Sequence, residues 1–495
     1  MAELPDTAPF SADLFRQCGH ELVDAIADFL AETPNRRLSP SVPLDRFFGG
    51  IIEDHPVPLK GEPAASLLRE TADLLFKHSV LTAHPKFFGF INASAHPLGA
   101  LADLLASAVN PNVAAPYIGP IASAIERQTV AWLGELTGFG ENISGILTSG
   151  GSVANIMGVH VARTSKTTWD GRKQGMTRPE AQKLRVYATD QTHSWLGKAA
   201  HVLGFGSDGI HWIPTDGEQR MSTAALRAAV EEDRRNGLLP AIVVATCGTT
   251  STGAIDPMGE MSEVCREADL WLHVDAAYGG LAAVVKDAPE DVRLLSKADS
   301  LAVDPHKWLY VPFEAGCLLT KTEAALLSSF REGSSYYGTA GDKGLPPPFR
   351  ELGLQTSRGF RALKVWLCLR HLGKEKYTEL IGKNIELAKH LFRLADASPK
   401  LEARTCSLSI TTLRYVPEGL SQSAPGQSSY LDRLNERIVR ELQTSGLSYP
   451  SHAQVAGDYV IRVCVVNFNT TERDIQDFAR QVEAIGDRLH GSGVA

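Results

Sequence analysis

Short apolar runs alternate with helix-like stretches between about residue 95 and residue 330, and this alternation limits the fold more than any other feature of the chain. Each run has the length of a buried strand and leads into a polar or glycine-containing segment. Strands that alternate with helices form a mostly parallel sheet, so the sequence predicts an α/β fold. The expected strands are SGILTS (144–149), LRVYAT (184–189), AIVVAT (241–246), WLHV (271–274) and SLAV (300–303).

The segment before this region has a different pattern. Residues 12–31 place apolar side chains at helical spacing, and such a stripe must pack against another surface. Prolines then punctuate residues 32–60, which we expect to form either an arm that reaches across a dimer or a surface linker.

The segment after about residue 375 is typical of a smaller α+β domain. Expected helices surround the alternating segment YVIRVCVV (459–466), and Thr471 with Asp474 resembles a capping box. These helices cover 375–395, 429–444 and 471–488. The predicted units are therefore an N-terminal helical arm (1–90), a large domain (91–374) and a small C-terminal domain (375–495).

Composition excludes several classes of protein. Among the 495 residues, 49 Lys and Arg against 57 Asp and Glu give a net charge of −8 without clusters, which argues against nucleic-acid binding. The seven cysteines are scattered without a C-x-x-C pair, so no disulfide framework and no metal site are expected. The N-terminus lacks the pattern of a signal peptide, and no run approaches ~18 apolar residues. We therefore expect a cytoplasmic protein that does not enter a membrane.

Several reactive residues come just after the apolar runs. Ligands of an open parallel sheet bind beyond the carboxyl ends of its strands. Taken singly, each residue is more often a cap, a turn or a solvated side chain, but several strand ends here carry complementary chemistry. The residues are Gly150, Gly151, Ser152, His193, Thr250, Asp275, His306 and Lys307.

One cofactor, pyridoxal 5′-phosphate (PLP), needs all of these functions. Its phosphate needs backbone N–H groups at a helix N-terminus, which the segment SGGS (149–152) supplies. Its pyridine nitrogen needs a carboxylate, for which Asp275 is the candidate, and its aldehyde needs a lysine such as Lys307 to form a Schiff base. His193 can stack on its ring.

The motifs together resemble the group II PLP-dependent decarboxylases, the family of aromatic-L-amino-acid, histidine and glutamate decarboxylases. The resemblance covers roughly residues 15–490, and HVDAAY (273–278) with DPHKW (304–308) carries most of it. Further matching segments are HPKFFGF (84–90), SGGS (149–152), DQTHS (190–194), ATCGTT (245–250), SRGFRALKVW (357–366) and RVCVVN (462–467).

The resemblance implies a role for each matched residue and a fold. Lys307 is the Schiff-base lysine, Asp275 the pyridine partner and His193 the stacking ring. The other residues implied in cofactor binding are Gly150, Gly151, Ser152, Thr250, Ala277 and His306. The implied fold is that of PLP-dependent transferases of fold type I, like aspartate aminotransferase. It has a large domain with a mostly parallel seven-stranded sheet and a smaller C-terminal α+β domain. The implied assembly is a homodimer with a shared active site.

The expected reaction is that of a carboxy-lyase acting on a small-molecule amino acid. Phe87, Phe88 and Phe90 of the HPKFFGF segment favour an aromatic substrate, although they suit core packing equally well. His306 is expected to approach the substrate as well. No basic residue stands out to bind a second substrate carboxylate, which weakens glutamate as a candidate.

One position departs from the family pattern. Counting back from SRGFRALK without a gap puts Phe349 where members of this type carry a tyrosine on a mobile loop, the residue credited with returning a proton to Cα. In related plant enzymes this replacement accompanies oxidative deamination, which gives an aldehyde, ammonia and hydrogen peroxide. An aromatic aldehyde synthase is therefore the alternative. If a one-residue gap in the alignment hides the tyrosine, or if Tyr336, Tyr337 or a histidine returns the proton to Cα, the protein is a plain decarboxylase.

Two rival classes are less consistent with the sequence. GFGSDG (204–209) matches the G-x-G-x-x-G pattern of dehydrogenases but runs into IHWIP, which has the pattern of a strand and turn rather than of a helix. A non-catalytic relative that only binds partners would be signalled by loss of Lys307 or Asp275, and both are present.

Overall fold

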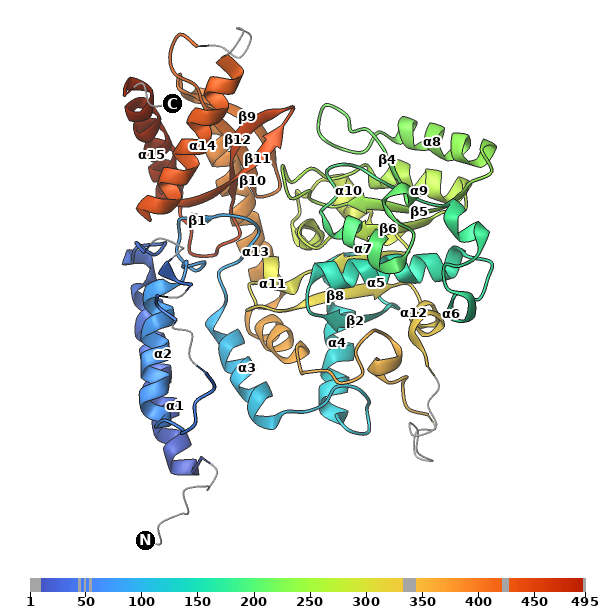
Figure 1. The fold of residues 1–495 in the computed structure, drawn as a ribbon, viewed down its shortest axis with the longest axis horizontal. Coiled ribbons are helices and arrows are strands. Elements are labelled where there is room, and N and C mark those ends of the chain that lie inside the picture. Colours follow the sequence, from blue (N-terminus) through green and yellow to red (C-terminus); the bar gives the residue numbers. More distant parts are fainter. Residues whose placement is uncertain are drawn as a thin grey trace.

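The computed structural model describes residues 10–42, 46–48, 50–52, 56–332, 344–420 and 427–492. A seven-stranded sheet forms the centre of the large domain in the order β2-β8-β7-β6-β5-β3-β4 (Figure 1). All neighbouring pairs are parallel except the two that β8 makes with β2 and β7. The expected mostly parallel, seven-stranded α/β fold is therefore confirmed. The strands are β2 (Ser144–Thr148), β3 (Leu184–Ala188), β4 (Ile210–Trp212), β5 (Leu239–Thr246), β6 (Trp271–Asp275), β7 (Ser300–Val303) and β8 (Gly316–Thr320).

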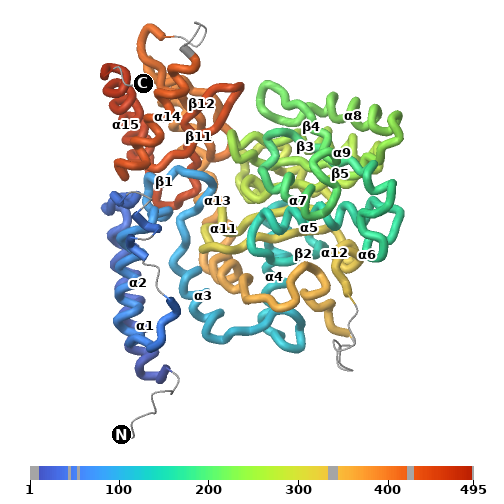
Figure 2. The backbone as a smooth tube through the Cα atoms, in the orientation of Figure 1, coloured from blue at the N-terminus to red at the C-terminus, as the bar shows by residue number. Residues whose placement is uncertain are grey.

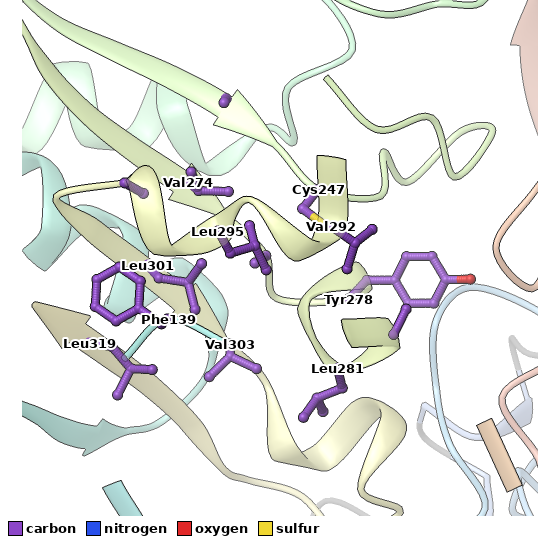
Figure 3. Close-up of a cluster of buried hydrophobic side chains, with 14 of the residues drawn as sticks. Phe139, Cys247, Val274, Tyr278, Leu281, Val292, Leu295, Leu301, Val303 and Leu319 are labelled. Atoms are coloured by element: carbon purple, nitrogen blue, oxygen red, sulfur yellow. The ribbon is translucent and has the colours of Figure 1, made fainter. Parts of the chain in front are cut away.

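Helices cover this sheet because its central strands are apolar on both faces, as parallel strands usually are. On one face, Val274, Leu301, Val303 and Leu319 pack with Phe139 in a fully buried cluster (Figure 3). The helices of this domain are α3 (Pro97–Val109), α4 (Pro120–Leu136), α5 (Gly151–Lys166), α6 (Gly171–Gln174), α7 (Trp195–Leu203), α8 (Thr223–Arg235), α9 (Met258–Glu267), α10 (Glu290–Arg293), α11 (Pro305–Trp308) and α12 (Glu323–Phe330).

The G-x-G-x-x-G match does not form a dinucleotide site. Gly204 ends helix α7 in the left-handed conformation, and the segment then leads through a short 3₁₀ turn into β4. The pattern therefore follows a helix and precedes a strand, the reverse of the order that a dinucleotide fold needs.

A second sheet of five strands forms the centre of the C-terminal domain, in the order β1-β11-β12-β10-β9. Its first strand comes from residues 87–88, which the sequence assigns to the N-terminal arm, and it lies beside the C-terminal strands in Figure 2. The capping box of Thr471 and Asp474 is confirmed at the start of α15. The elements are β1 (Phe87–Phe88), β9 (Leu401–Ser407), β10 (Ile410–Tyr415), β11 (Tyr449–Val455), β12 (Asp458–Cys464), α14 (Gln427–Ser445) and α15 (Glu472–Gly491).

Helix α13 (Ala362–Ala397) joins the two domains. It contacts α3 and α4 of the large domain and β9 and β10 of the small one. Its helical geometry breaks at Gly373, where φ is +71°, a value that glycine adopts without steric cost. The predicted boundary between residues 374 and 375 lies directly after this break.

The N-terminal residues form two helices that pack along each other at one edge of the molecule (Figure 1). Helix α1 (Ala12–Glu32) begins and ends within a residue of the predicted stripe, and α2 (Ala64–His78) follows the proline-rich segment. The rings of Phe29 and Phe76 stack between them at 4.2 Å. Among the described residues, no helix has both the length and the apolar composition that a membrane crossing requires.

Candidate active site

A cavity of about 300 Å³ lies at the carboxyl ends of β2, β5, β6 and β7. All nine residues that the sequence assigns to cofactor binding line it. They converge because parallel strands end at the same edge of the sheet, so residues far apart in the chain meet there. These residues are Gly150, Gly151, Ser152, His193, Thr250, Asp275, Ala277, His306 and Lys307.

One wall of the cavity is the N-terminus of helix α5. Gly150 precedes the helix with φ of +137°, a conformation that side-chain-bearing residues rarely adopt, and no described side chain caps the first turn. Gly151 is also sterically required, because a Cβ atom there would lie 2.6 Å from Asp304 Oδ2. The N–H groups of this turn and the positive end of the helix dipole are therefore available to an anion.

Asp275 ends strand β6 with both carboxylate oxygens bound. Its Oδ2 accepts a hydrogen bond from Trp195 Nε1 at 2.7 Å, and its Oδ1 accepts one from the Ala277 backbone N–H at 3.2 Å. The residue is 7% exposed and lines the cavity. A buried carboxylate held from two sides keeps one orientation, which suits it to bind a fixed cationic N–H group.

Lys307 lies on the short helix α11, which follows β7 directly. Its Nζ lies 3.2 Å from Asp304 Oδ2, and Asp304 is only 2% exposed. The other oxygen, Asp304 Oδ1, has no hydrogen-bond partner among the described residues. Sequence reasoning missed Asp304, although it belongs to the DPHKW motif, because an aspartate after a strand usually caps the next helix.

Two histidine rings line the cavity, and burial favours the neutral form of both. His193 Nδ1 accepts a hydrogen bond from the Trp195 backbone N–H at 3.2 Å, and desolvation lowers the pKa of His193 while the charge of Asp275 partly opposes that shift. His306 Nδ1 accepts a hydrogen bond from the Ala315 N–H at 3.1 Å, and burial likewise lowers the pKa of His306. Neutral rings of this kind can stack on a flat ligand or exchange a proton with it.

The structure does not bring the three phenylalanines of HPKFFGF into this cavity. Phe87 is 3% exposed and stacks on Tyr449 at 5.4 Å, and Phe88 is fully buried against Phe478. In the described chain these two rings take the core-packing alternative that the sequence left open, because β1 pairs with β11 and both rings pack in the small domain. Phe90 is 57% exposed and lines a neighbouring cavity of about 480 Å³ that shares Thr250 with the first.

Phe349 also lies away from the cavity. It is 1% exposed and packs in a hydrophobic cluster with Val113, Ile146 and Leu352. The guanidinium carbons of Arg127 and Arg358 lie 5.1 and 5.0 Å from the centre of its ring. The residue that the count from SRGFRALK places at the lid position is thus a buried one in the described chain. Tyr336 and Tyr337, the other proton donors considered, lie outside the described residues.

Arg462 is a further residue at the site that sequence reasoning missed. Its Nε donates to the Thr250 backbone oxygen at 2.6 Å and its Nη1 to the Phe90 oxygen at 2.9 Å, while the residue is only 2% exposed. It thereby fixes the loop that carries Thr250. The available signal was a charged residue inside the otherwise apolar strand pattern of RVCVV (462–466).

The residues around the cavity fit PLP. Two buried polar atoms without a hydrogen-bond partner among the described residues, Thr246 Oγ1 and Asp304 Oδ1, belong to residues that line it. Buried polar atoms are rarely left unpaired unless a ligand or water satisfies them. An uncapped helix N-terminus, a fixed carboxylate and a lysine on the same cavity match the phosphate, the pyridine nitrogen and the aldehyde of this cofactor.

Comparisons with known proteins agree with this chemistry. The pyridoxal-dependent decarboxylase conserved domain matches residues 51–406. The aromatic-L-amino-acid decarboxylase of Bacillus atrophaeus is 31% identical over 492 residues, 98% of each chain. A phenylacetaldehyde synthase of a Rosa hybrid cultivar is 28% identical, with 94% of this chain and 92% of the relative covered. Among solved structures, Oryza sativa TDC with PLP and tryptamine superimposes with a TM-score of 0.88 at 26% identity, covering 97% of this chain and 99% of the other.

Proposed function

Since the chain belongs to the pyridoxal-dependent decarboxylase family, we propose that it removes CO₂ from an aromatic L-amino acid and releases the corresponding amine. The cofactor is PLP, and the reaction class is that of a carboxy-lyase. The observation that carries the proposal is the meeting of Lys307, Asp275 and the start of α5 at one cavity.

Each of these groups has a distinct task in the proposed reaction. Lys307 would hold the aldehyde carbon of the cofactor, the first turn of α5 its phosphate, and Asp275 its pyridine nitrogen. When bound, PLP supplies an electron sink for the electron pair left at Cα when CO₂ departs. The neutral ring of His193 would stack on the cofactor face, and His306 lies on the same cavity wall as Lys307.

An aromatic substrate is supported by the apolar groups around the cavity and by the relatives. Ile91, Tyr278 and Phe313 line the cavity, and the exposed ring of Phe90 lines the cavity that adjoins it at Thr250. Apolar walls also favour loss of the carboxylate, because they solvate it poorly. Relatives that act on aromatic amino acids, such as the tyrosine decarboxylase of Oryza sativa subsp. japonica at 30% identity, agree with this choice.

An aldehyde product is the second candidate. Relatives named as aldehyde synthases favour it, among them the solved 4-hydroxyphenylacetaldehyde synthase of Rhodiola rosea, with a TM-score of 0.84 at 25% identity. In this chain the Phe349 ring is buried and does not line the cavity, so its geometry adds no support to the argument from the sequence. We therefore favour the amine.

We also propose that the protein is a homodimer with a shared active site. Helix α3 leaves a row of apolar side chains uncovered, and contiguous apolar surface of this kind is typical of interfaces between proteins. A second copy of the chain is the natural partner, since the N-terminal helices α1 and α2 also expose apolar side chains such as Phe15 and Leu75. The uncovered residues of α3 are Leu101, Leu104, Leu105 and Val109, each at least half exposed. Light scattering of the purified protein would test this.

The proposed cytoplasmic location is supported by the cysteines. All seven are free, and six of them are buried. Free, buried thiols are typical of proteins in reducing compartments.

A panel of L-amino acids tests the reaction. Purified protein loaded with PLP would be given tryptophan, tyrosine, phenylalanine, histidine and glutamate, with CO₂, amine, aldehyde and hydrogen peroxide measured for each. We expect an equal yield of CO₂ and amine from an aromatic substrate, without peroxide. Equal amounts of aldehyde and peroxide would establish the second candidate, and activity on glutamate alone would overturn the aromatic assignment.

A further inference from the structure

Trp195 contacts two groups of the cavity through two different atoms. It is the first residue of helix α7, and its backbone N–H donates to His193 Nδ1 at 3.2 Å. Its indole Nε1–H donates to Asp275 Oδ2 at 2.7 Å. The residue therefore links the ring proposed to stack on the cofactor with the carboxylate proposed to bind the pyridine nitrogen.

The indole is held firmly in its place. Trp195 is 1% exposed and packs in a cluster that includes Val186, Ala188 and Leu196. Its ring lies perpendicular to that of His273, with the ring centroids 6.1 Å apart and an interplanar angle of 90°. The His273 ring is itself fixed, because Asn155 Oδ1 and Ser300 Oγ each lie 2.8 Å from one of its nitrogens.

The electrostatics of this arrangement favour a positioning role. Burial lowers the pKa of His273 to about 4, so its ring is neutral near pH 7 and adds no charge beside Asp275. The indole N–H is then the side-chain donor that faces Asp275 Oδ2, while the Ala277 backbone faces Oδ1. Without the indole N–H, one oxygen of a buried carboxylate would lose its partner, and the carboxylate could rotate.

We propose that Trp195 is a positioning residue that orients the Asp275 carboxylate toward the pyridine nitrogen and the His193 ring toward the cofactor face. This inference rests on the proposed function, because it takes the roles of Asp275 and His193 from it. The contact with Asp275 uses the indole and the contact with His193 uses the backbone of the same residue, so a side-chain substitution removes the first contact directly.

A purely structural role is the competing explanation, and the chain offers a matched control. Trp271 begins β6, the strand that Asp275 ends, and its Nε1 donates to Ser300 Oγ at 2.8 Å. It therefore shares with Trp195 an indole N–H bound to a side chain, but it does not line the cavity. Replacing either tryptophan by phenylalanine keeps an aromatic ring and removes the indole N–H.

The experiment compares Trp195→Phe and Trp271→Phe with the wild type as full-length holoenzymes. The readouts are the dissociation constant of PLP, the visible circular dichroism of the bound cofactor, and kcat and KM. For Trp195→Phe we expect a dissociation constant about tenfold higher, as loss of a hydrogen bond to a charged group implies. We also expect a weaker dichroic band and a lower kcat at nearly unchanged KM. Trp271→Phe should match the wild type in the band and in the dissociation constant.

The inference is overturned if Trp195→Phe keeps the wild-type dichroic band and dissociation constant, whatever its thermal stability. A wild type without visible cofactor absorbance would instead overturn the proposed function. If Trp195→Phe does not fold, the indole resonances of ¹⁵N-labelled wild type provide the test. An indole N–H resonance that persists in Trp271→Phe should shift when PLP binds, and the absence of any such shift would count against the inference.

Discussion

The cavity at the strand ends and the buried segment around Phe349, which leads into the SRGFRALKVW motif (357–366), differ in what they build. The cavity gathers nine predicted residues from separate strand ends. Around Phe349 lies a cluster of apolar side chains and buried charges, and Phe349 itself lines none of the described cavities. The residues predicted from strand ends line one cavity, whereas the residue predicted by counting along a connecting segment does not line it.

The buried charges explain why the Phe349 segment is fixed. Glu126 of α4 and Arg358 are both essentially inaccessible and form a bidentate ion pair, with one contact of 3.1 Å. Arg358 also donates to the Leu147 backbone oxygen at 2.7 Å. The segment is therefore tied to strand β2, and the Phe349 ring packs against both Arg358 and Arg127.

The largest expected effect is at Lys307. Lys307→Ala should abolish turnover and covalent retention of PLP, because this amine is the proposed attachment point. The fold should persist, since the side chain lies on the cavity wall and not in the core. Borohydride reduction of the wild type followed by peptide mapping checks the assignment, and a label on any other lysine would contradict it.

Asp275→Asn should retain PLP but lower turnover by about 10²- to 10³-fold, because the charge opposite the pyridine nitrogen is lost. The near-isosteric amide keeps the side-chain volume and can still accept a hydrogen bond from Trp195 Nε1. Steady-state kinetics with absorbance of the bound cofactor measures both quantities. Normal turnover would mean that Asp275 acts only as a structural group. The cavity and the Phe349 segment would then no longer differ in function at this residue.

Arg358→Met should act on stability instead. Removing one partner of a buried ion pair leaves Glu126 uncompensated and should lower the free energy of unfolding by about 3–5 kcal/mol. Urea unfolding measures this loss, and the absorbance of PLP bound to the protein that remains folded should match that of the wild type. A changed cofactor spectrum at unchanged stability would mean that the segment acts on the cofactor site and not only on the stability of the fold.

Much of the site followed from the sequence because short apolar strands are recognisable and their carboxyl ends share one edge. Asp275 and Lys307 were found in this way. Asp304 was missed although its contact with Lys307 at 3.2 Å is local, because an aspartate after a strand usually caps the next helix. Trp195 was missed because its importance depends on a contact between elements far apart in the chain, with Asp275 at 2.7 Å. Such contacts have no periodicity along the chain.

The position of the phenylalanines in the small domain was not predicted, for a different reason. Phe87 and Phe88 form a strand two residues long, too short to show alternation, and that strand joins the C-terminal sheet more than three hundred residues away. An aromatic run is equally compatible with a pocket wall and with a core, and only the pairing of β1 with β11 decides between them.

The smallest expected effect is that of Phe349→Tyr, which also separates the two views of this position most clearly. If Phe349 stood in for a catalytic tyrosine on an exposed loop, the variant would shift product from aldehyde to amine at almost unchanged stability. The structure leads to the opposite expectation. The ring is 1% exposed within an apolar cluster, so the new hydroxyl is buried and should cost about 1–3 kcal/mol unless it finds a partner. The amine-to-aldehyde ratio, oxygen uptake and peroxide should match the wild type.

Phe330→Tyr, at the rim of the same cluster with 9% exposure, is the matched control and should lose less stability. A changed product ratio in Phe349→Tyr but not in Phe330→Tyr would mean that Phe349 takes part in the reaction despite its burial. The aldehyde route would then regain its support from the sequence.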